Sequence, residues 1–245
     1  MNVRSFVRRY DRAILDPAVR ALYGGTDFYN HGDWSVGPDG PPRGLGEAAC
    51  RLVDRHLAVD PPECAGRIGV VLDVGCGLGP STKIMARRYP ATLVLGVNLS
   101  AAQLRRAVAT PSAARFAAMD AVDLAIASNA VDRVHAVEAA FHFDTRLGFL
   151  REAHRVLRPG GKLVLSDILY SRRVFGVPEE NYWLDEADYR EQCAGAGFVV
   201  ESLEDITHDT VEPSCDYLAA KGRQAFAKAL RRAIDAYWFV VLRRP

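Results

Sequence analysis

The fold of this chain is decided by the stretch Leu72-Asp73-Val74-Gly75-Cys76-Gly77-Leu78-Gly79. A short apolar run ends in an acid and passes directly into three glycines at alternate positions. The first two glycines let the backbone turn tightly and approach a ligand, and Gly79 lets a following helix close against a sheet. The spacing is one residue shorter than the dinucleotide-binding pattern G-x-G-x-x-G. Because no G-K-[ST] follows, the loop is not a P-loop nucleotide site.

Short β-rich runs alternate with helical patterns on both sides of this stretch. The patterns predict strands at residues 68–74, 92–97, 115–118, 131–137 and 162–167. They predict helices at residues 80–88, 101–109 and 145–157, and the last of these is expected to end at Arg158-Pro159-Gly160-Gly161. Strand–helix alternation of this kind indicates a mostly parallel sheet with helices on both faces.

The flanking segments extend this unit. Residues 185–196 and 217–233 have helical patterns, and residues 198–203 and 237–242 read as two further strands. Residues 1–60 read as helical segments around an aromatic, glycine-rich stretch, and we expect them to form a cap. We therefore predict one α/β domain over residues 1–245. Its sheet is expected to be doubly wound, mostly parallel and seven-stranded. The core lies at residues 65–170, the cap precedes it, and a C-terminal segment at 171–245 adds the last strands.

Composition narrows the class of protein. The net charge is +1, with 31 basic and 30 acidic side chains, whereas a nucleic-acid-binding protein would show a marked basic excess. The cysteines are widely spaced and have no zinc-ligand pattern, so we predict no metal site and a reducing, cytoplasmic compartment. They are Cys50, Cys64, Cys76, Cys193 and Cys215. The charged N-terminus lacks a signal-peptide pattern, and no apolar run is long enough to span a membrane.

Polar side chains follow five successive predicted strands. These residues are Asp73, Asn98, Asp120, Glu138 and Asp167. The carboxyl ends of parallel strands meet at one edge of a sheet, where open α/β folds bind their ligands. The sequence therefore predicts a cleft lined by polar and acidic groups, which suits a cationic ligand better than a pyrophosphate.

These motifs identify a family resemblance. The pattern Asp73-x-Gly75-x-Gly77-x-Gly79 resembles the first motif of the class I S-adenosylmethionine-dependent methyltransferases, which have a Rossmann-like fold. The resemblance continues through residues 96–100, 119–121, 132–143 and 157–163. The aromatic segment at 28–34 is similar to the lid entrance of family members that act on small molecules. The resemblance implies S-adenosylmethionine as cofactor and a small-molecule acceptor as substrate.

The resemblance also implies roles in cofactor binding. The backbone of Gly75, Cys76, Gly77 and Gly79 would cradle the methionine part, and Asp73 would lie near its ammonium group. Asn98 takes the place of the acid that usually holds the ribose hydroxyls, and it loses the charge-assisted bonds of that acid. Further expected cofactor contacts come from the adenine side, the end of the fourth strand and the lid. They are Leu99, Gln103, Asp120, Ala121, Glu138 and Tyr29.

Methyl transfer to an oxygen requires the loss of a proton, for which a general base is useful. His142, just beyond the fourth strand, is the candidate base, with Asp167 as the group that orients it or shares the proton. His31 in the aromatic segment is the rival base. We also expect His31, Trp34 and Phe141 to contact the acceptor.

Three alternatives stay open from the sequence. Methylation of carbon or nitrogen would use the same cleft with less need for a base. A non-transferring, cyclase-like member would retain the cofactor without consuming it. A nicotinamide oxidoreductase rests on the fold alone and is weakened by the glycine spacing and by Asp73. For the preferred reading, methylation of a secondary-metabolite hydroxyl, we expect a monomer or a homodimer.

Overall fold

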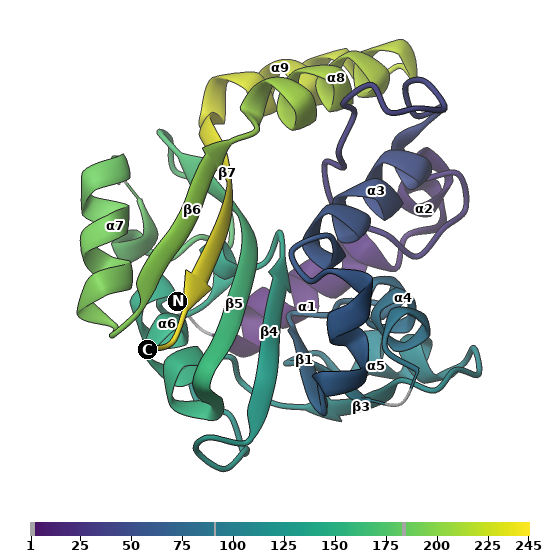
Figure 1. The fold of residues 1–245 in the computed structure, drawn as a ribbon. Helices are drawn as coiled ribbons and strands as arrows, with labels where there is room; N and C mark the ends of the chain where they lie inside the picture. The colour runs from purple at the N-terminus through teal and green to yellow at the C-terminus, as the bar shows by residue number, and fades with distance from the viewer. Residues whose placement is uncertain (1–2, 91, 183–184) are drawn as a thin grey trace.

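One twisted sheet organises the molecule (Figure 1). The computed structural model describes residues 3–90, 92–182 and 185–245. Within them the sheet has seven strands in the order β3-β2-β1-β4-β5-β7-β6. Their bounds are Val70–Val74 (β1), Leu93–Asn98 (β2), Arg115–Ala118 (β3), Val131–Val137 (β4), Leu157–Tyr170 (β5), Val199–Asp205 (β6) and Ile234–Arg243 (β7). Strands β1 to β5 run parallel, and β7 is antiparallel to both β5 and β6. The predicted doubly wound, mostly parallel, seven-stranded fold is confirmed.

Helices cover both faces of this sheet. On one face α3 packs against α4 and β4, and α5 lies beside β2 and β3. On the other face α6 and α7 enclose the largest apolar cluster together with β4, β5 and β7. The bounds are Leu45–Leu57 (α3), Pro80–Arg88 (α4), Ala101–Val108 (α5), Arg146–Val156 (α6) and Glu186–Gly195 (α7). Short 3-10 turns occupy Pro62–Arg67, Ala140–His142 and Glu179–Asn181.

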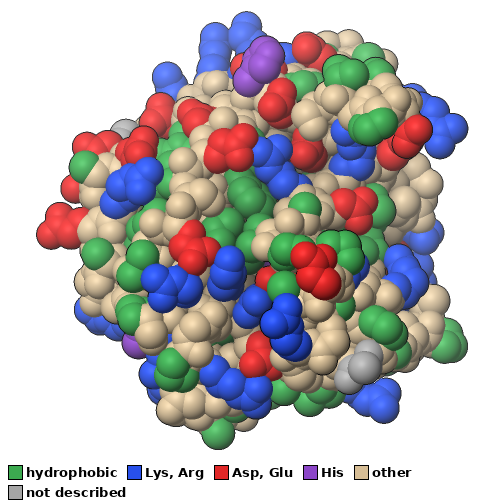
Figure 2. Space-filling view, viewed as in Figure 1, with side chains coloured by type: hydrophobic (Ala, Val, Ile, Leu, Met, Phe, Trp, Pro, Cys, Tyr) green, Lys and Arg blue, Asp and Glu red, His purple; other side chains and the backbone are tan. Residues whose placement is uncertain are grey.

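The remaining helices lie beyond the carboxyl ends of the parallel strands. Helices α1 (Val3–Ile14) and α2 (Pro17–Leu22) belong to the predicted cap, and α8 (Thr207–Ala220) and α9 (Gln224–Ala233) connect β6 to β7. In Figure 1, α8 and α9 run across the top of the molecule above β6 and β7. Charged side chains of both signs are interspersed over the same face in Figure 2, in keeping with the net charge of +1.

Two sequence predictions for the elements need correction. The single helix predicted at residues 217–233 is two helices, because Gly222 takes a positive φ of 81° that ends α8, and α9 starts afresh at Gln224. Strand β5 begins at Leu157, not at residue 162. The turn residues Gly160 and Gly161 exchange backbone hydrogen bonds with Arg244 after β7, so they continue the sheet. No helix in the described residues is long and apolar enough to cross a membrane.

Candidate active site

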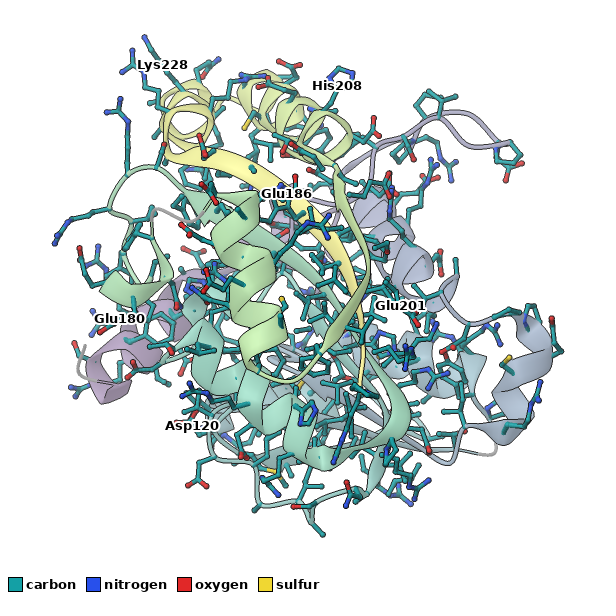
Figure 3. All side chains as sticks on the ribbon, turned by 60° about the vertical axis from the view of Figure 1, so that its left-hand side comes forward. Asp120, Glu180, Glu186, Glu201, His208 and Lys228 are labelled. Carbon is teal, nitrogen blue, oxygen red and sulfur yellow. The ribbon has the colours of Figure 1, made fainter. Side chains whose placement is uncertain are left out.

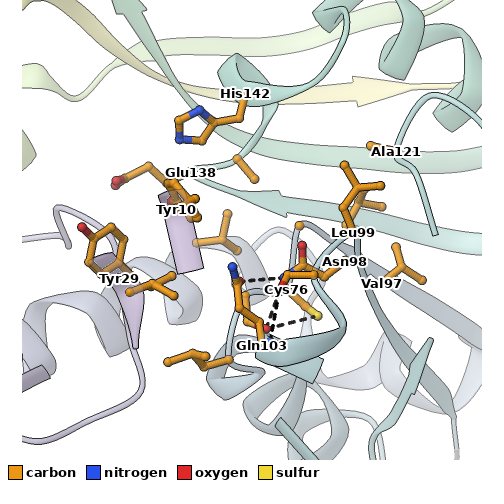
Figure 4. A pocket seen from close by; sticks show the side chains of 18 of the residues that line it. Tyr10, Tyr29, Cys76, Val97, Asn98, Leu99, Gln103, Ala121, Glu138 and His142 are labelled. Carbon is orange, nitrogen blue, oxygen red and sulfur yellow. Dashed lines mark hydrogen bonds between the residues drawn. The ribbon is translucent and has the colours of Figure 1, made fainter. Parts of the chain in front are cut away.

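A pocket with about 1250 Å³ of empty space, including its solvent-facing part, lies at the carboxyl ends of β1, β2 and β4 beneath α1. Eleven of the predicted site residues line it. They are Tyr29, Gly75, Cys76, Gly77, Asn98, Leu99, Gln103, Asp120, Ala121, Glu138 and His142. Figure 4 shows His142, Glu138, Tyr10 and Tyr29 toward one end and Cys76, Asn98, Leu99 and Gln103 toward the other.

The glycine loop forms the floor of this pocket. Gly75 and Cys76 both donate their N–H groups to the Val97 carbonyl oxygen, at 2.9 and 3.1 Å, which fixes the turn after β1. Gly75 has a φ of +78°, and a Cβ atom there would lie 2.6 Å from the Cβ of Ala139. Gly77 also has a positive φ, but a Cβ there would meet nothing closer than 3.9 Å and would project into open space. The backbone at Gly77 is therefore left free for a ligand to approach.

Asp73 lies behind the loop and does not line the pocket. It is buried, and its Oδ2 accepts hydrogen bonds of 2.6 Å from the hydroxyls of Ser81 and Thr82 on α4. Burial raises the pKa of this carboxyl group. Asp73 joins β1 to the start of α4 and so holds the glycine loop in place, and its predicted place near a ligand ammonium stays a prediction. Gly79 also lies outside the lining, and it serves packing, because a Cβ there would lie 2.8 Å from the Phe116 ring.

A polar chain links the second strand to the N-terminal helix. Asn98 at the end of β2 donates from Nδ2 to Gln103 Oε1 at 2.8 Å. Gln103 in turn donates from Nε2 to Asp11 of α1 at 2.8 Å, and the Ser100 hydroxyl donates to the same Asp11 oxygen at 2.7 Å. Asp11 was not predicted from the sequence. It fastens α1 over the pocket wall that Asn98 and Gln103 form.

Glu138 follows β4 in an unusual backbone conformation for a residue with a side chain. Its φ is +53°, and its Oε2 accepts hydrogen bonds from the His31 N–H at 2.6 Å and from the Tyr237 hydroxyl at 2.8 Å. Strained backbone of this kind is concentrated at functional sites. Removal from water raises the pKa of Glu138 to about 8, against the effect of these two donors.

His142 is held with one ring nitrogen facing a carbonyl group. Its Nδ1 lies 2.7 Å from the Gly176 carbonyl oxygen, which can only accept a hydrogen bond. Nδ1 therefore carries the proton, and the Nε2 of the neutral ring keeps its lone pair. Phe6, Tyr10 and Phe141 pack around the ring, and burial lowers its pKa to about 4. His142 is thus a neutral proton acceptor in the pocket wall at ordinary pH.

Asp167 does not orient His142, contrary to the sequence prediction. It is fully buried, and its Oδ2 accepts hydrogen bonds from Arg146 Nε at 2.6 Å and from the Tyr189 hydroxyl at 3.0 Å. Arg146 also donates to the Asn181 carbonyl oxygen, and the Asn181 amide donates to the carbonyl oxygens of Phe141 and Phe143. Asp167 therefore supports the segment that carries His142 from below and makes no direct contact with the ring.

The three residues predicted to contact an acceptor lie outside the pocket lining. His31 Nδ1 is hydrogen bonded to the Ser214 hydroxyl at 2.7 Å, and burial lowers its pKa to about 4. The Trp34 indole donates to the His31 carbonyl oxygen and its ring packs on Tyr217. Phe141 is buried in the core between β5 and α8. These corrections follow from α8, which the sequence did not place over the aromatic segment.

The sequence also missed residues that line the pocket. Phe6, Val7, Tyr10 and Ile14 all come from one face of α1. Their spacing of three to four residues is the signal of a helix with one apolar face, but it does not show which surface that face covers. His208 is an example of a residue far from the pocket. It is exposed on α8, and in Figure 3 it lies at the opposite end of the view from the pocket residue Asp120.

Comparisons with known proteins agree with this architecture. Residues 72–165 match the family described as a methyltransferase domain. The chain is 30% identical over 236 residues to erythromycin 3''-O-methyltransferase of Saccharopolyspora erythraea, covering 84% of this chain and 73% of that protein. It is also 30% identical over 232 residues to 27-O-demethylrifamycin SV methyltransferase of Amycolatopsis mediterranei, covering 88% and 82%. A solved geranyl diphosphate methyltransferase shares the fold, with a TM-score of 0.75, 20% identity, and coverage of 99% and 98%.

The fold and the site therefore define a class. The chain belongs to the class I S-adenosylmethionine-dependent methyltransferases. It is an enzyme that transfers a methyl group from this cofactor to a small molecule, and the nicotinamide alternative is set aside. The pocket fits the cofactor's positive charges, because its lining includes four acids and, among the described residues, no lysine or arginine. The acids are Asp27, Asp120, Glu138 and Asp144.

Proposed function

We propose that this enzyme methylates a hydroxyl group of a secondary metabolite, with His142 as the general base. The observation that carries the proposal is the position of His142. Its protonated Nδ1 is held by Gly176, and it lines the same pocket as the glycine loop. One relative described above is named as an O-methyltransferase of erythromycin, and another as a methyltransferase of 27-O-demethylrifamycin SV. A hydroxyl acceptor is the nucleophile that most needs this base.

The charge of the pocket supports a particular kind of acceptor. No lysine or arginine is among its described lining residues, so a phosphate or diphosphate would find no positively charged side chain there. Aromatic and aliphatic side chains of α1 line the space near His142 instead. We infer an uncharged or weakly charged acceptor, such as a polyketide alcohol or its glycoside.

One end of the pocket would bind the cofactor and the other end the acceptor. In the cofactor half, we propose that Gly75, Cys76 and Gly77 hold the methionine part, Asn98 and Gln103 the ribose, and Leu99, Asp120 and Ala121 the adenine. In the acceptor half we place Phe6, Tyr10, Tyr29, Glu138 and His142. The cofactor supplies an electrophilic methyl group on a sulfonium. The chain orients the acceptor, excludes water beneath α1 and takes the hydroxyl proton on His142 Nε2, and orientation alone gives effective molarities of about 10⁵–10⁸ M.

The decisive experiment is His142→Ala, assayed by mass spectrometry against a panel of polyketide alcohols and their glycosides. We expect products heavier by one CH₂ with the native enzyme and a 10²–10⁴-fold loss of turnover, roughly, in the variant. Affinity for S-adenosylhomocysteine should stay nearly unchanged. His208→Ala, on the exposed surface of α8, is the control and should retain full turnover.

The same assay separates the alternatives. Full activity of His142→Ala would favour methylation of carbon or nitrogen, in which no hydroxyl proton is removed. Conversion of a substrate without consumption of the cofactor would favour the cyclase-like alternative. Loss of activity in His31→Ala with normal activity in His142→Ala would transfer the role of base to His31.

We further propose that residues 1–245 act as one domain, as a monomer or homodimer, in the cytoplasm. The five cysteines are all free thiols, which is typical of a reducing compartment. Sedimentation velocity at several protein concentrations tests the oligomeric state, and a tetramer would contradict it.

A further inference from the structure

We propose that Glu138 is a charge sensor: it loses its proton when the sulfonium cofactor binds and regains it when the neutral thioether product takes its place. This proposal concerns the cofactor and its product, so it stands whatever the acceptor is. It goes beyond positioning, because it gives the pocket a means of telling S-adenosylmethionine from S-adenosylhomocysteine, which differ by one methyl group and one positive charge.

The position of Glu138 next to the glycine loop is the first argument. Strands β1 and β4 are neighbours in parallel register, with Asp73 opposite His135. The chain positions just beyond these strand ends, Gly75 and Glu138, are thereby brought close together. The residue after Glu138, Ala139, lies where a Cβ on Gly75 would be only 2.6 Å away. Glu138 and the glycine loop therefore line the same pocket, and a cofactor cradled by the loop would turn its sulfonium toward the half of the pocket that Glu138 lines.

The hydrogen bonds of the carboxyl group are the second argument. Both donors, the His31 N–H and the Tyr237 hydroxyl, bind to Oε2. A proton on the neutral acid therefore resides on Oε1. Oε2 keeps its two donors in both protonation states, so the group can change its charge without losing its place. The constrained backbone at φ +53°, whose N–H donates to the carbonyl oxygen and hydroxyl of Ser166, keeps the side chain in one position.

Within the described part of the chain, no permanently positive side chain contacts Glu138 to stabilise its anion. The titratable groups that influence it are phenols from four sides and one histidine. They are Tyr10 on α1, Tyr23 and Tyr29 before and within the aromatic segment, Tyr170 on β5, Tyr237 on β7, and His31. Burial raises the pKa values of these phenols and lowers that of His31, so all of them are neutral at ordinary pH. A bound sulfonium would be the missing cation.

The charge balance follows from this. With the pKa of Glu138 at about 8, the free enzyme at pH 7 carries the neutral acid in most molecules. A nearby positive charge lowers the pKa of a carboxyl group, and the proton leaves to solvent. If the acceptor is a hydroxyl, as proposed above, methylation removes the cation and frees one proton. Uptake of a proton by Glu138 then leaves no unpaired charge in the pocket with the product.

Isothermal titration calorimetry tests the sensor without any acceptor. S-adenosylmethionine and S-adenosylhomocysteine are titrated separately at pH 7 in phosphate and in Tris, whose ionisation enthalpies differ. The dependence of the measured heat on the buffer counts the protons released. We expect close to one proton for S-adenosylmethionine and close to none for S-adenosylhomocysteine. Glu138→Gln should abolish the difference, and Asp144→Asn, which removes another pocket acid, should preserve it.

The pH dependence of the native enzyme gives an independent measure that no variant can obscure. Because the anion binds the sulfonium, affinity for S-adenosylmethionine should rise up to tenfold per pH unit between pH 6.5 and 8 and then level off. Affinity for S-adenosylhomocysteine should stay flat. Equal proton release by the two ligands would show that Glu138 responds to the ammonium group they share. Parallel pH profiles, or proton release that persists in Glu138→Gln, would overturn the proposal.

Discussion

The cofactor half and the acceptor half of the pocket are assembled from chain segments of different kinds. In the cofactor half, the glycine loop is fixed by contacts between consecutive strands, such as the hydrogen bonds from Gly75 and Cys76 to Val97, and only the residues after β2 reach a distant segment, Asp11 of α1. In the acceptor half, His142 depends on Gly176, and Glu138 depends on His31 and Tyr237, which are 107 and 99 residues away. The first half is a local structure, and the second is a tertiary one.

This difference indicates where the enzyme can vary. A binding site made from backbone and local turns persists as long as the glycines remain. A site made from distant side chains changes whenever α1 or the segment around Gly176 changes. Such an arrangement explains how one cofactor fold can serve many acceptors. Damage to one half should therefore leave the other half largely intact.

The largest effect is expected from Arg146→Met, which tests the support of the acceptor half. The variant leaves Asp167 as an unpaired charge in the core, at 0% exposure, and removes the donor to Asn181. Loss of one partner of a buried ion pair costs about 3–5 kcal/mol in the free energy of unfolding. Urea denaturation measures this loss. Turnover should fall as well, since Asn181 holds the backbone on both sides of His142.

A second variant makes this test specific. Arg146→Met combined with Asp167→Leu removes both charges and should recover much of the lost stability, because no buried charge is left alone. In both variants, affinity for S-adenosylhomocysteine should change little once the protein is folded. A loss below about 1 kcal/mol in the single variant would contradict the role given to this pair.

The next largest effect is expected from alanine substitutions at Gly75 and Gly77 of the cofactor half, which should change stability and cofactor affinity differently. Gly75→Ala places a Cβ against Ala139 and should cost about 3 kcal/mol of stability, from overpacking and from the positive φ. Gly77→Ala has space for its Cβ and should cost roughly 1 kcal/mol. Its methyl group occupies the ligand's side of the loop, so cofactor affinity should fall about tenfold or more.

Thermal unfolding and calorimetry with S-adenosylhomocysteine measure the two quantities. Gly66→Ala, at a position with open space and an ordinary φ, is the matched control and should change neither. Equal losses of stability at Gly75 and Gly77 would show that the loop is packed throughout and has no open side.

The smallest effect concerns the contact between the cofactor half and α1. Asn98→Asp restores the acid usual in the family, but it turns a carboxylate toward Gln103 Oε1, which can only accept. Gln103 would have to rotate its amide group to donate to this carboxylate, and Oε1 would then face the Asp11 carboxylate. We therefore expect no gain in cofactor affinity from the single variant. In the double variant Asn98→Asp and Asp11→Asn, the new amide at position 11 can donate to Gln103. Cofactor affinity of this double variant should rise roughly fivefold.

A double-mutant cycle on S-adenosylhomocysteine binding isolates this coupling. We expect an interaction energy of about 1 kcal/mol between positions 11 and 98. Additive effects would mean that Asn98 is independent of α1. In that case the departure from the usual acid would need another explanation.

The sequence predicted the cofactor half well and the acceptor half poorly, for physical reasons. Strand–helix periodicity and the glycine pattern are local, so the sheet could be inferred, together with the eight predicted residues that line the cofactor half of the pocket. The partner of Asp167 could not be inferred from the sequence, because a position at a strand end shows where a side chain begins but not what it contacts. In the structure, the partner is Arg146 of α6. The position of His31 and Trp34 outside the pocket lining could not be inferred, because it depends on their contacts with Ser214 and Tyr217 of α8. Tyr10 was missed because α1 is fixed over the pocket by distant contacts, such as those of Asp11 with Ser100 and Gln103 and of Phe6 with His142.

The place of β7 between β5 and β6 has a consequence for the order of folding. Strand β6 ends at Asp205, but the neighbour it pairs with begins only at Ile234, so β6 has no partner when it leaves the ribosome. Its exposed edge must wait until β7 inserts, and such edges favour aggregation. Tyr237, which donates to Glu138, arrives on that same strand. A chain that ends before Ile234 therefore lacks both the partner of β6 and the hydroxyl that donates to Glu138.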